Sequence, residues 1–407
     1  MRRVAITGAG VVSPIGKGWA QFTDALASAR SGIRPLPPEI AQRSSVEVGA
    51  LVDWDARADI GANEAASLDR VSQFALAAAA EALACSGLDL ASADRSRIGT
   101  YWGTGMGGAH SLEAAYRQLY ASGEWRLRPL TVVMAMNNAA ASNVAVRHGL
   151  RGAFANYSTA CSSSAMALGE AMRTIAAGRA DAILAGGAEA LLTPGMLAAW
   201  HALRTLAPAD AADPAASCKP FDKRRAGLVL GEGAAAFVLE DEAHARARGA
   251  VIRGFLSGYG NTCDAVHLSR PDAGGQARAM RAALDEAGVA CSEIGYLNAH
   301  GTATQVGDLV EAEAIDAVFG EAAPRVASTK SMHGHLLGAA GALEFAVALH
   351  ALEEGVAAPT AFLEEPDPAA KLRHVALSAE RITAPHAVMS NSFAFGGSNV
   401  VLVATRA

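Results

Sequence analysis

Short apolar runs alternate with longer amphipathic segments along the chain. The short runs have the length of buried strands, and they lie at 3–12, 97–102, 152–157, 181–186, 294–299, 325–329, 374–379, 386–391 and 398–404. The longer segments carry apolar residues three or four positions apart and predict helices at 67–86, 109–121, 137–148, 161–177, 193–203, 240–248, 274–287, 307–319 and 337–353. This alternation is typical of an α/β protein whose mainly parallel, buried sheets are covered by helices.

Two long apolar runs, 228–239 and 251–259, lie on either side of the charged segment 240–248. At 407 residues the chain is longer than most single domains. We therefore predict two halves, 1–245 and 246–407, each with its own strands and helices. Their direct similarity in sequence is too faint to prove a repeat.

The first apolar run ends in Gly8 and Gly10, which resembles the beginning of a dinucleotide-binding fingerprint. The third glycine position is Ser13, however, and Pro14 follows where a phosphate-binding helix needs backbone donors. The glycine-rich segment 103–108 also follows a predicted strand. We expect no nucleotide at either place.

Composition narrows the functional classes. Hydrophobic residues make up 51% of the chain, which favours a compact enzyme over a disordered or fibrous protein. A net charge of −6 gives no reason to expect nucleic acid as a partner. No apolar run suits a membrane span or a signal peptide, so we expect a cytoplasmic protein. The five cysteines lack C-x-x-C spacing and predict reduced thiols without a metal site.

Cys161 is the first candidate for chemistry. Residues 154–157 suit the end of a strand, and a helical pattern runs from Cys161 to Gly178. Unpaired backbone N–H groups at a helix N-terminus favour a thiolate, which is a nucleophile near neutral pH. A buried, inert cysteine is an equally good interpretation of this stretch alone.

Three further loops carry polar groups where predicted strands end. The first, 298–311, contains His300; the second, 328–341, contains Lys330 and His335; the third, 391–398, contains Phe395 and paired glycines. Loops at strand ends are where α/β proteins bind ligands. Each loop also has a structural interpretation, because a lone His is more often a loop residue than a catalyst and paired glycines often form only a turn.

Together these loops resemble one protein family. The segments T-A-C-S-S-S at 159–164, N-A-H-G-T-A-T at 298–304, K-S-M-H-G-H-L-L-G-A-A-G at 330–341 and N-S-F-A-F-G-G-S at 391–398 are similar in order and spacing to motifs of the elongating β-ketoacyl-acyl carrier protein synthases. The resemblance covers nearly the whole chain. It implies the thiolase fold, with five αβαβα layers built from two similar halves, and a homodimer or a heterodimer with a related subunit.

The resemblance also implies a mechanism. Cys161 accepts an acyl chain from acyl carrier protein, and malonyl-acyl carrier protein then loses CO₂ and condenses with that chain. Neutral His300 and His335 donate hydrogen bonds to the enolate, and the backbone N–H groups of Cys161 and Phe395 form an oxyanion hole. The only prosthetic group expected is the phosphopantetheine of the carrier protein.

Lys330 is expected inside the protein, near Asp308, Glu311 and Glu344. A buried lysine needs such partners. We predict that this ionic network fixes the loops that carry the two histidines, and Lys330 is also a candidate for a direct part in decarboxylation.

Substrate contacts follow from the same resemblance. Thr302 and Thr304 correspond to residues that bind the phosphopantetheine arm, and Phe395 corresponds to the gate at the mouth of the acyl pocket. Met106 corresponds to a position at the far end of that pocket, where a bulky side chain limits chain length. A role for Met106 as ordinary core filler is an open alternative.

The predicted docking surface for the carrier protein is a small basic patch, because the helix start at 65–67 lacks basic residues. Its members are Arg126, Arg128, Lys223 and Arg225. The chain also departs from the family pattern at Leu228, Gln305, His333 and Ala394. These departures favour a specialised carrier protein or substrate, such as a polyene or polyketide chain, over housekeeping fatty acids.

Three other functions remain for comparison. A degradative thiolase needs a second active-site cysteine, which the loops 330–341 and 391–398 lack. A non-elongating, chain-length partner subunit needs no nucleophile, and a Cys-His hydrolase needs neither a second histidine nor the Lys330 loop.

Overall fold

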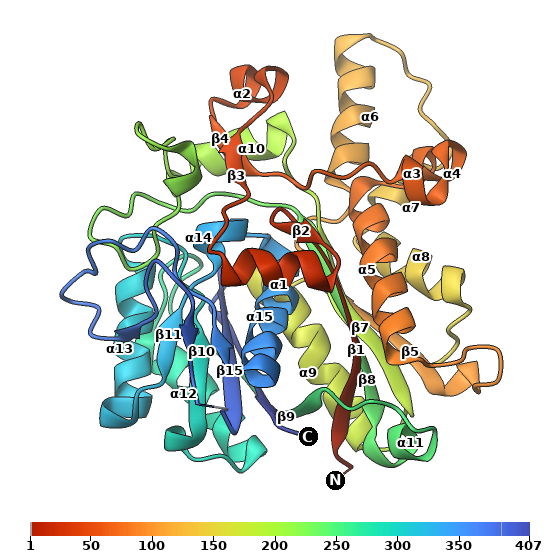
Figure 1. Cartoon of the computed structure of the whole chain (residues 1–407). Helices are drawn as coiled ribbons and strands as arrows, with labels where there is room; N and C mark the ends of the chain where they lie inside the picture. The colour runs from red at the N-terminus through yellow and green to blue at the C-terminus, as the bar shows by residue number, and fades with distance from the viewer. Residues whose placement is uncertain (1, 384) are drawn as a thin grey trace.

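The computed structural model describes residues 2–383 and 385–407, which form five layers in the order α, β, α, β, α (Figure 1). Helices α9 (Ser163–Ala176) and α15 (Ala340–Glu354) make the middle layer and pack against each other and against strands on both sides. Helix α15 is buried from Ala340 to Leu352, in keeping with a sequence that is apolar almost all round. The predicted thiolase-like α/β class is confirmed.

The two β layers belong to one hydrogen-bonded sheet of twelve strands, of which eleven follow one another in a continuous order and β2 pairs only with β1. The strands are β1 Val4–Ser13, β2 Gly16–Lys17, β5 Ile98–Gly103, β6 Phe154–Tyr157, β7 Ala182–Glu189, β8 Gly233–Asp241, β9 Gly254–Cys263, β10 Ile294–Asn298, β11 Arg325–Ala327, β13 Arg373–His374, β15 Ala387–Ala394 and β16 Ser398–Thr405. Two small sheets pair β3 (Ile33–Pro35) with β4 (Val48–Ala50) and β12 (Val356–Ala357) with β14 (Glu380–Arg381).

The strand order reveals a repeat that sequence similarity left unproven. One part runs β1-β8-β7-β5-β6 across the sheet, and the other runs β9-β16-β15-β10-β11. In each part the first two pairings are antiparallel and the next two are parallel. The two parts therefore have the same topology.

The expectation of mainly parallel sheets is wrong. β8 is antiparallel to both of its neighbours, β1 and β7, and β16 is antiparallel to β9 and β15. β15 and β16 form a hairpin whose turn contains Gly396 and Gly397, both with positive φ. Most of the loop predicted at 391–398 is therefore strand. Of the strand predicted at 374–379, only His374 lies in a strand, the two-residue β13.

The outer layers differ on the two sides of the molecule. Helices α5 (Arg70–Ser86) and α8 (Ala139–His148) cover the N-terminal strands, whereas α12 (Ala273–Ala287) covers the C-terminal strands and packs on α13 (Gly307–Phe319). Asp69 caps α5 by accepting a hydrogen bond from the backbone of Val71, so the helix begins at Arg70, three residues later than predicted.

Gly8 and Gly10 have a packing role. A Cβ atom on Gly8 would lie 2.1 Å from the carbonyl oxygen of Ala82 in α5, and one on Gly10 would lie 2.2 Å from that of Ala78. These glycines let β1 lie directly against the helix backbone, which explains them without a nucleotide.

The remaining helices are α1 Trp19–Ala27, α2 Pro38–Ser44, α3 Arg57–Ile60, α4 Ala62–Ala66, α6 Ala109–Ala121, α7 Thr131–Ala135, α10 Pro194–Ala202, α11 Glu242–Ala247 and α14 Lys330–His333. Helix α6 keeps its predicted bounds and projects from the body of the molecule (Figure 1). Within the described residues, no helix combines the length and the apolar character that a membrane crossing requires.

Candidate active site

Cys161 lies at the start of the central helix α9. It belongs to a single 3₁₀ turn, Ala160–Ser162, directly before the α-helix. The backbone of Ala160 has a φ of 49°, a value that residues other than glycine rarely adopt. The chain therefore turns sharply before the cysteine. Ser163 holds the turn by accepting a hydrogen bond from the backbone of Thr159 at 2.9 Å and donating one to the carbonyl of Ala160 at 2.7 Å. The cysteine is only 4% exposed.

His300 follows β10 and is fixed through its backbone. The carboxylate of Glu311, in α13, accepts hydrogen bonds from the N–H groups of His300 at 2.8 Å and Gly301 at 2.7 Å. It also accepts one from the side chain of Asn391 in β15 at 3.1 Å. One buried carboxylate therefore joins the His300 loop to the neighbouring strand and limits its movement.

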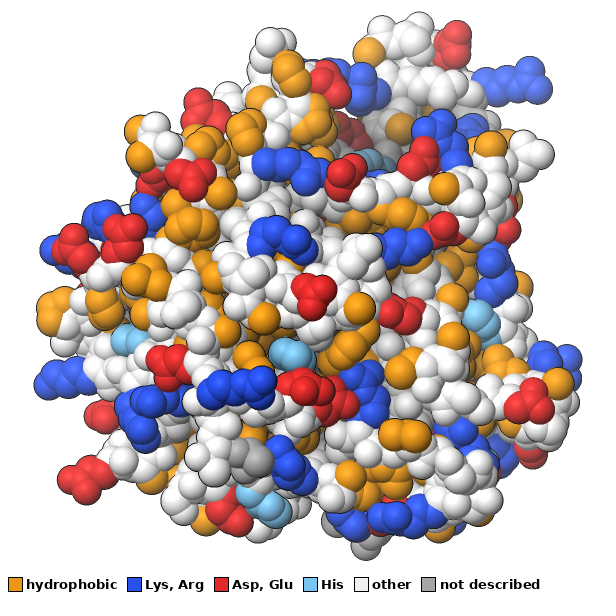
Figure 2. All heavy atoms as spheres, viewed as in Figure 1, with side chains coloured by type: hydrophobic (Ala, Val, Ile, Leu, Met, Phe, Trp, Pro, Cys, Tyr) orange, Lys and Arg blue, Asp and Glu red, His pale blue; other side chains and the backbone are white. Residues whose placement is uncertain are grey.

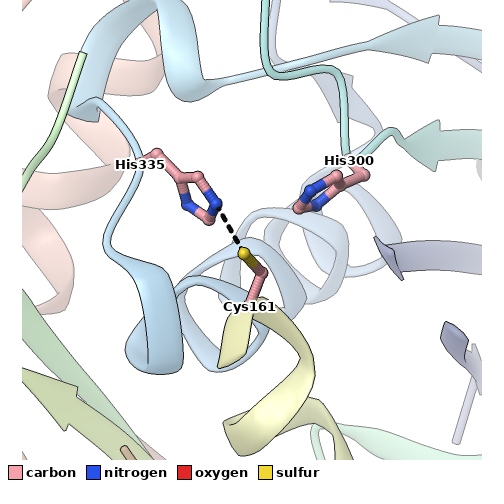
Figure 3. Close-up of side chains that lie close together, drawn as sticks. All are labelled: Cys161, His300 and His335. Atoms are coloured by element: carbon pink, nitrogen blue, oxygen red, sulfur yellow. Dashed lines mark hydrogen bonds between the residues drawn. The ribbon is translucent and has the colours of Figure 1, made fainter. Parts of the chain in front are cut away.

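His335 approaches Cys161 from the loop after α14. Its Nε2 lies 3.0 Å from Sγ of Cys161, and its backbone N–H donates to the carbonyl of Val229 at 2.7 Å. The ring of His300 lies on the other side of the sulfur, with its centroid 5.4 Å from that of His335 and the rings nearly perpendicular (Figure 3). The fold thus brings two distant loops to the sulfur atom of Cys161.

Hydrogen bonds fix the tautomer of each histidine. The backbone N–H of Leu337 lies 3.2 Å from Nδ1 of His335, and a backbone N–H only donates. The ammonium of Lys330, which also only donates, lies 3.4 Å from Nδ1 of His300. Because both Nδ1 atoms accept, the ring proton of each neutral histidine is on Nε2. Each histidine then presents an N–H donor at its Nε2 position.

Both histidines are held neutral. Burial lowers the pKa of His300 and of His335 well below the ordinary value of 6.5, and the Lys330 ammonium lowers both further. At neutral pH the two rings are therefore uncharged hydrogen-bond donors, as an enolate-stabilising pair requires.

The same tautomers oppose metal binding. Single donor atoms from Cys161, His300 and His335 lie within 4.8 Å of one another, which is close to the span of a metal site. A histidine binds a metal through an unprotonated nitrogen, but the Nε2 atoms here carry protons. If the proton moved to Nδ1, it would face the backbone N–H of Leu337 in His335 and the ammonium of Lys330 in His300, and two donors repel each other. This donor set does not suit a metal ion.

The expectation of a thiolate at Cys161 is wrong. Burial raises the pKa of the thiol to about 12, although Lys330 and the backbone N–H groups of Phe395 and Cys161 act in the opposite direction. The turn has only a few N–H groups near the sulfur, and their effect is smaller than the loss of solvent. The resting form is therefore the thiol, and its proton must leave when a thioester arrives.

The predicted ionic network divides into separate groups. Lys330, which is fully buried, forms an ion pair with Glu344 in α15 and contacts His300. Glu311 bonds to the His300 loop as described above, whereas Asp308 accepts from the backbone of Phe221 at 2.8 Å. Burial raises the pKa of Glu344 and Asp308 to about 7. Asp308 thus anchors a neighbouring loop and makes no direct bond to Lys330.

A cavity of 440 Å³ opens at the three side chains. Thr302 and Thr304 line it, with their hydroxyl oxygens 3.0 Å apart, and so does Phe395, whose ring stacks on Trp200 at 6.0 Å. Met106 does not line this cavity, and its side chain is 42% exposed. The place of Met106 at the far end of the acyl pocket stays a prediction.

Comparison with known proteins identifies the family. Residues 1–245 match the β-ketoacyl synthase N-terminal domain, and residues 251–364 match the corresponding C-terminal domain. The chain belongs to the β-ketoacyl synthase family.

Relatives align along almost their full length. Nodulation protein E of Rhizobium meliloti is 41% identical over 98% of both chains, and 3-oxoacyl-[acyl-carrier-protein] synthase 2 of Staphylococcus aureus is 39% identical over 99% of this chain and 98% of its own. A solved structure described as the ishigamide ketosynthase/chain length factor is 34% identical, covers 100% of this chain and 99% of its own, and has a TM-score of 0.92.

The predicted basic patch needs one correction in this β-ketoacyl synthase. Arg225 is 2% exposed and binds Asp367 at 2.7 Å and the backbone of Thr304 and Gln305 at 3.0 and 2.8 Å, so it holds the 302–305 loop and is not available for docking. Arg126, Arg128 and Lys223 are exposed. On the face drawn in Figure 2, basic and acidic side chains are interspersed.

Sequence reasoning missed the role of Glu189 at the end of β7. Its buried carboxylate accepts hydrogen bonds from Gly105 and Gly338 at 2.7 and 2.9 Å and from Met106 at 3.1 Å, and burial raises its pKa to about 7. It joins the glycine-rich loop to the loop of His335. The stacking of Trp200 on Phe395 was also missed, and nothing in the local pattern indicates it.

The additional histidine, His333, points away from the reaction. Its Nδ1 donates to the carbonyl of Gly334 at 2.7 Å, so its Nε2 accepts from Thr329 at 2.9 Å. This is the opposite tautomer to that of His300 and His335, and His333 does not line the cavity.

The raised pKa of Cys161 predicts how the free thiol reacts. We expect its alkylation by iodoacetamide to accelerate about tenfold per pH unit from pH 6 to 9, because only the small thiolate fraction reacts. Peptide mass spectrometry separates Cys161 from the exposed Cys85 and Cys263, and Cys161→Ala is the control. A rate that is constant between pH 6 and 8 would instead show a stabilised thiolate.

Proposed function

We propose that the chain is a β-ketoacyl-[acyl-carrier-protein] synthase, an acyltransferase that extends a carrier-bound acyl chain. The observation that carries this proposal is the placement of the Cys161 thiol beside two neutral histidines, one of them 3.0 Å from the sulfur, each with its proton on Nε2. A nucleophile next to two hydrogen-bond donors suits a reaction in which a covalent acyl group meets an enolate.

In the first step Cys161 loses its proton, and its sulfur attacks the thioester carbonyl of acyl carrier protein. The carbon–sulfur bond to the carrier breaks, and the departing phosphopantetheine sulfur takes up the proton that Cys161 released. Backbone N–H groups of Cys161 and Phe395 are suited to the oxyanion of this step, because both already act on the sulfur. Loss of one such donor typically costs about 3–4 kcal/mol of transition-state stabilisation.

In the second step malonyl-acyl carrier protein loses CO₂, and the electrons of the broken carbon–carbon bond form an enolate. His300 and His335 stabilise the enolate oxygen through their Nε2–H groups. The enolate carbon attacks the acyl group, the bond to Cys161 breaks, and the sulfur leaves as a thiolate that takes up a proton from solvent. Lys330 supports this step by holding the proton of His300 on Nε2.

Thr302 and Thr304 are assigned to the phosphopantetheine arm, since both residues line the cavity and their hydroxyl oxygens lie side by side. Phe395, beside Trp200, is assigned to the entrance of the acyl pocket. No other prosthetic group is proposed. Arg126, Arg128 and Lys223 are retained as the docking patch for acyl carrier protein, and the products belong to fatty acid, polyene or polyketide synthesis.

We propose a dimer, either with a second copy or with a related subunit. Exposed large apolar side chains gather in one stretch of sequence, and monomeric proteins rarely expose large apolar patches. They are Met106, Leu112, Tyr116, Tyr120, Trp125, Leu130, Val132, Val133 and Met136. Met106 is assigned to the far end of the acyl pocket on the surface that the second subunit covers.

The halves 1–245 and 246–407 are proposed as the two units of the repeat, each with the same strand order. We place the protein in the cytoplasm, because its five cysteines are free and two of them are exposed.

Two alternative functions fit less well. A degradative thiolase needs a second cysteine in the cavity, but Cys161 is the only cysteine among the described residues that line it. A non-elongating partner subunit needs neither the nucleophile nor the oriented histidines.

Intact-protein mass spectrometry tests the proposed function. After incubation with an acyl-acyl carrier protein, the mass should rise by one acyl group, and malonyl-acyl carrier protein should discharge the adduct as a β-ketoacyl product. Cys161→Ala should fold but form no adduct, because Ala is compatible with the small residues of this turn. Condensation by that variant, or no adduct on the wild-type protein, would reject the assignment.

His300→Ala and His335→Ala should reduce malonyl decarboxylation more than acylation of Cys161, since the enolate charge develops only in the second step. We expect a loss of about 100-fold or more in decarboxylation for each variant. Radiolabelled CO₂ release and adduct formation measure the two steps separately. His333→Ala, outside the cavity, is the control. Greater loss of acylation than of decarboxylation in both variants would contradict the assigned roles.

Met106→Ala should lengthen the preferred acyl primer if Met106 ends the pocket. Each additional buried CH₂ contributes about 0.8 kcal/mol, so two carbons shift the preference by roughly tenfold. Turnover on a series of acyl-acyl carrier proteins measures this shift, and Leu112→Ala, at an equally exposed position in α6, is the control. An unchanged primer profile with a lower melting temperature would assign Met106 to packing alone.

A further inference from the structure

Gln276 is a buried polar residue in the cavity wall that the reaction described above does not use. It lies in the first turn of α12, is 2% exposed, and lines the same cavity as Cys161 and the two histidines. Its side-chain oxygen is buried and has no hydrogen-bond partner among the described residues. A buried carbonyl without a partner typically lowers the stability of the fold by about 1–3 kcal/mol. A role in binding would explain why a polar side chain occupies this position.

The strands of the C-terminal part place Gln276 on a defined wall. The ring of Phe393 lies 6.2 Å from that of His300, and Phe393 is paired across β15 and β16 with Asn399. Asn399 is paired in turn with Thr262 of β9, whose hydroxyl donates to the carbonyl of Gly275 at 2.8 Å. The residue before Gln276 is therefore fixed to the sheet that carries the active-site hairpin.

The polar neighbours of Gln276 are already paired. Asp264 accepts from the amide of Asn399 at 2.6 Å and from the backbone of Asp272 at 3.2 Å. Asp272 accepts from the backbone of Gly275 at 2.7 Å and caps the helix. These bonds leave the side-chain oxygen of Gln276, a residue of the cavity wall, without a partner among the described residues.

The charge of this wall limits the chemistry of that molecule. Asp264 and Glu311 also line the cavity, so a further carboxylate, such as that of a malonyl group, is disfavoured beside Gln276. A hydrocarbon chain would leave the carbonyl of Gln276 without a partner. A secondary amide suits the site, because its N–H donates to the Gln276 oxygen and its carbonyl accepts from the Gln276 amino group.

We propose that Gln276 binds an amide of the pantetheine arm that carries the substrate into the cavity. This inference rests on the proposed synthase function, in which every substrate arrives on such an arm. Gln276 is then a binding residue for the carrier arm on the wall of α12, in addition to the two threonines of the 302–304 loop. Its contribution depends on the arm and not on the acyl group.

Small thioesters that differ only in the arm test this proposal. The same acyl and malonyl groups are presented on pantetheine, which has two amides, on N-acetylcysteamine, which has one, and on ethanethiol, which has none. Wild type is compared with Gln276→Leu, which keeps the approximate size of the side chain and removes its hydrogen-bonding atoms. The measured quantity is kcat/KM for condensation on each arm.

We expect Gln276→Leu to lower kcat/KM about three- to tenfold on pantetheine, as for the loss of one hydrogen bond, and to leave kcat/KM on ethanethiol unchanged. A similar loss on N-acetylcysteamine would assign the contact to the amide nearer the sulfur, and no loss there would assign it to the farther amide. Both results support the proposal. An equal loss on all three arms, or no loss on pantetheine, would overturn it.

Stability provides an independent readout. Because Gln276→Leu removes a buried carbonyl that lacks a partner, its melting temperature should equal or exceed that of wild type. If this variant fails to fold, Gln276→Ala is compared on the same three arms by the same criteria. Failure of the proposed synthase function is recognised separately, because wild type would then form no acyl adduct and condense none of the three thioesters.

Discussion

The buried Lys330 ammonium is the charge on which the chemistry of the site depends. It forms an ion pair with Glu344 and donates toward Nδ1 of His300, which keeps the ring proton of that histidine on Nε2. It also lowers the pKa of His300, His335 and Cys161. A buried ion pair stabilises a fold weakly at best, so its main effect here is to set the protonation of its neighbours.

The repeat explains why these groups meet in the middle of the molecule. Cys161 comes from the N-terminal part, at the start of α9, and Lys330, His300 and His335 come from the C-terminal part. Helices α9 and α15 pack together between the sheets, so the residues that precede them are brought close by the same contact. Glu189 adds a link between the parts, because it accepts from Gly105 and Gly338. The active site therefore forms only when both parts have folded together.

Much of this arrangement was predictable from sequence. The α/β class followed from alternating short apolar runs and amphipathic helices, and α6 kept its predicted bounds because its apolar spacing is unbroken. The three loops were identified by residue types at strand ends and by family resemblance. Strand direction was not predictable. β8 and β16 lie antiparallel to their neighbours, and the apolar pattern of a strand is the same whichever way the strand runs.

The errors at the site have a common physical cause: they concern environment, which local sequence does not describe. Cys161 was expected as a thiolate from its place at a helix N-terminus, yet the loss of solvent around it has the larger effect on its pKa. Arg225 was expected on the surface from its charge, yet three neighbouring groups hold it inside. Both results depend on tertiary packing around a single side chain.

Opposing shifts in pKa limit how strongly pH acts on the folded state. The depressed pKa values of His300, His333 and His335 favour folding above pH 6.5, and this contribution is lost progressively as pH falls below that value. The raised pKa values of Glu189 and Glu344 have the opposite effect, because ionising these buried carboxyl groups destabilises the folded state. This destabilisation is absent below about pH 4.5 and complete above about pH 7. Between pH 4.5 and 6.5 the two groups partly cancel, so the buried site can hold many titratable groups without making stability steeply dependent on pH.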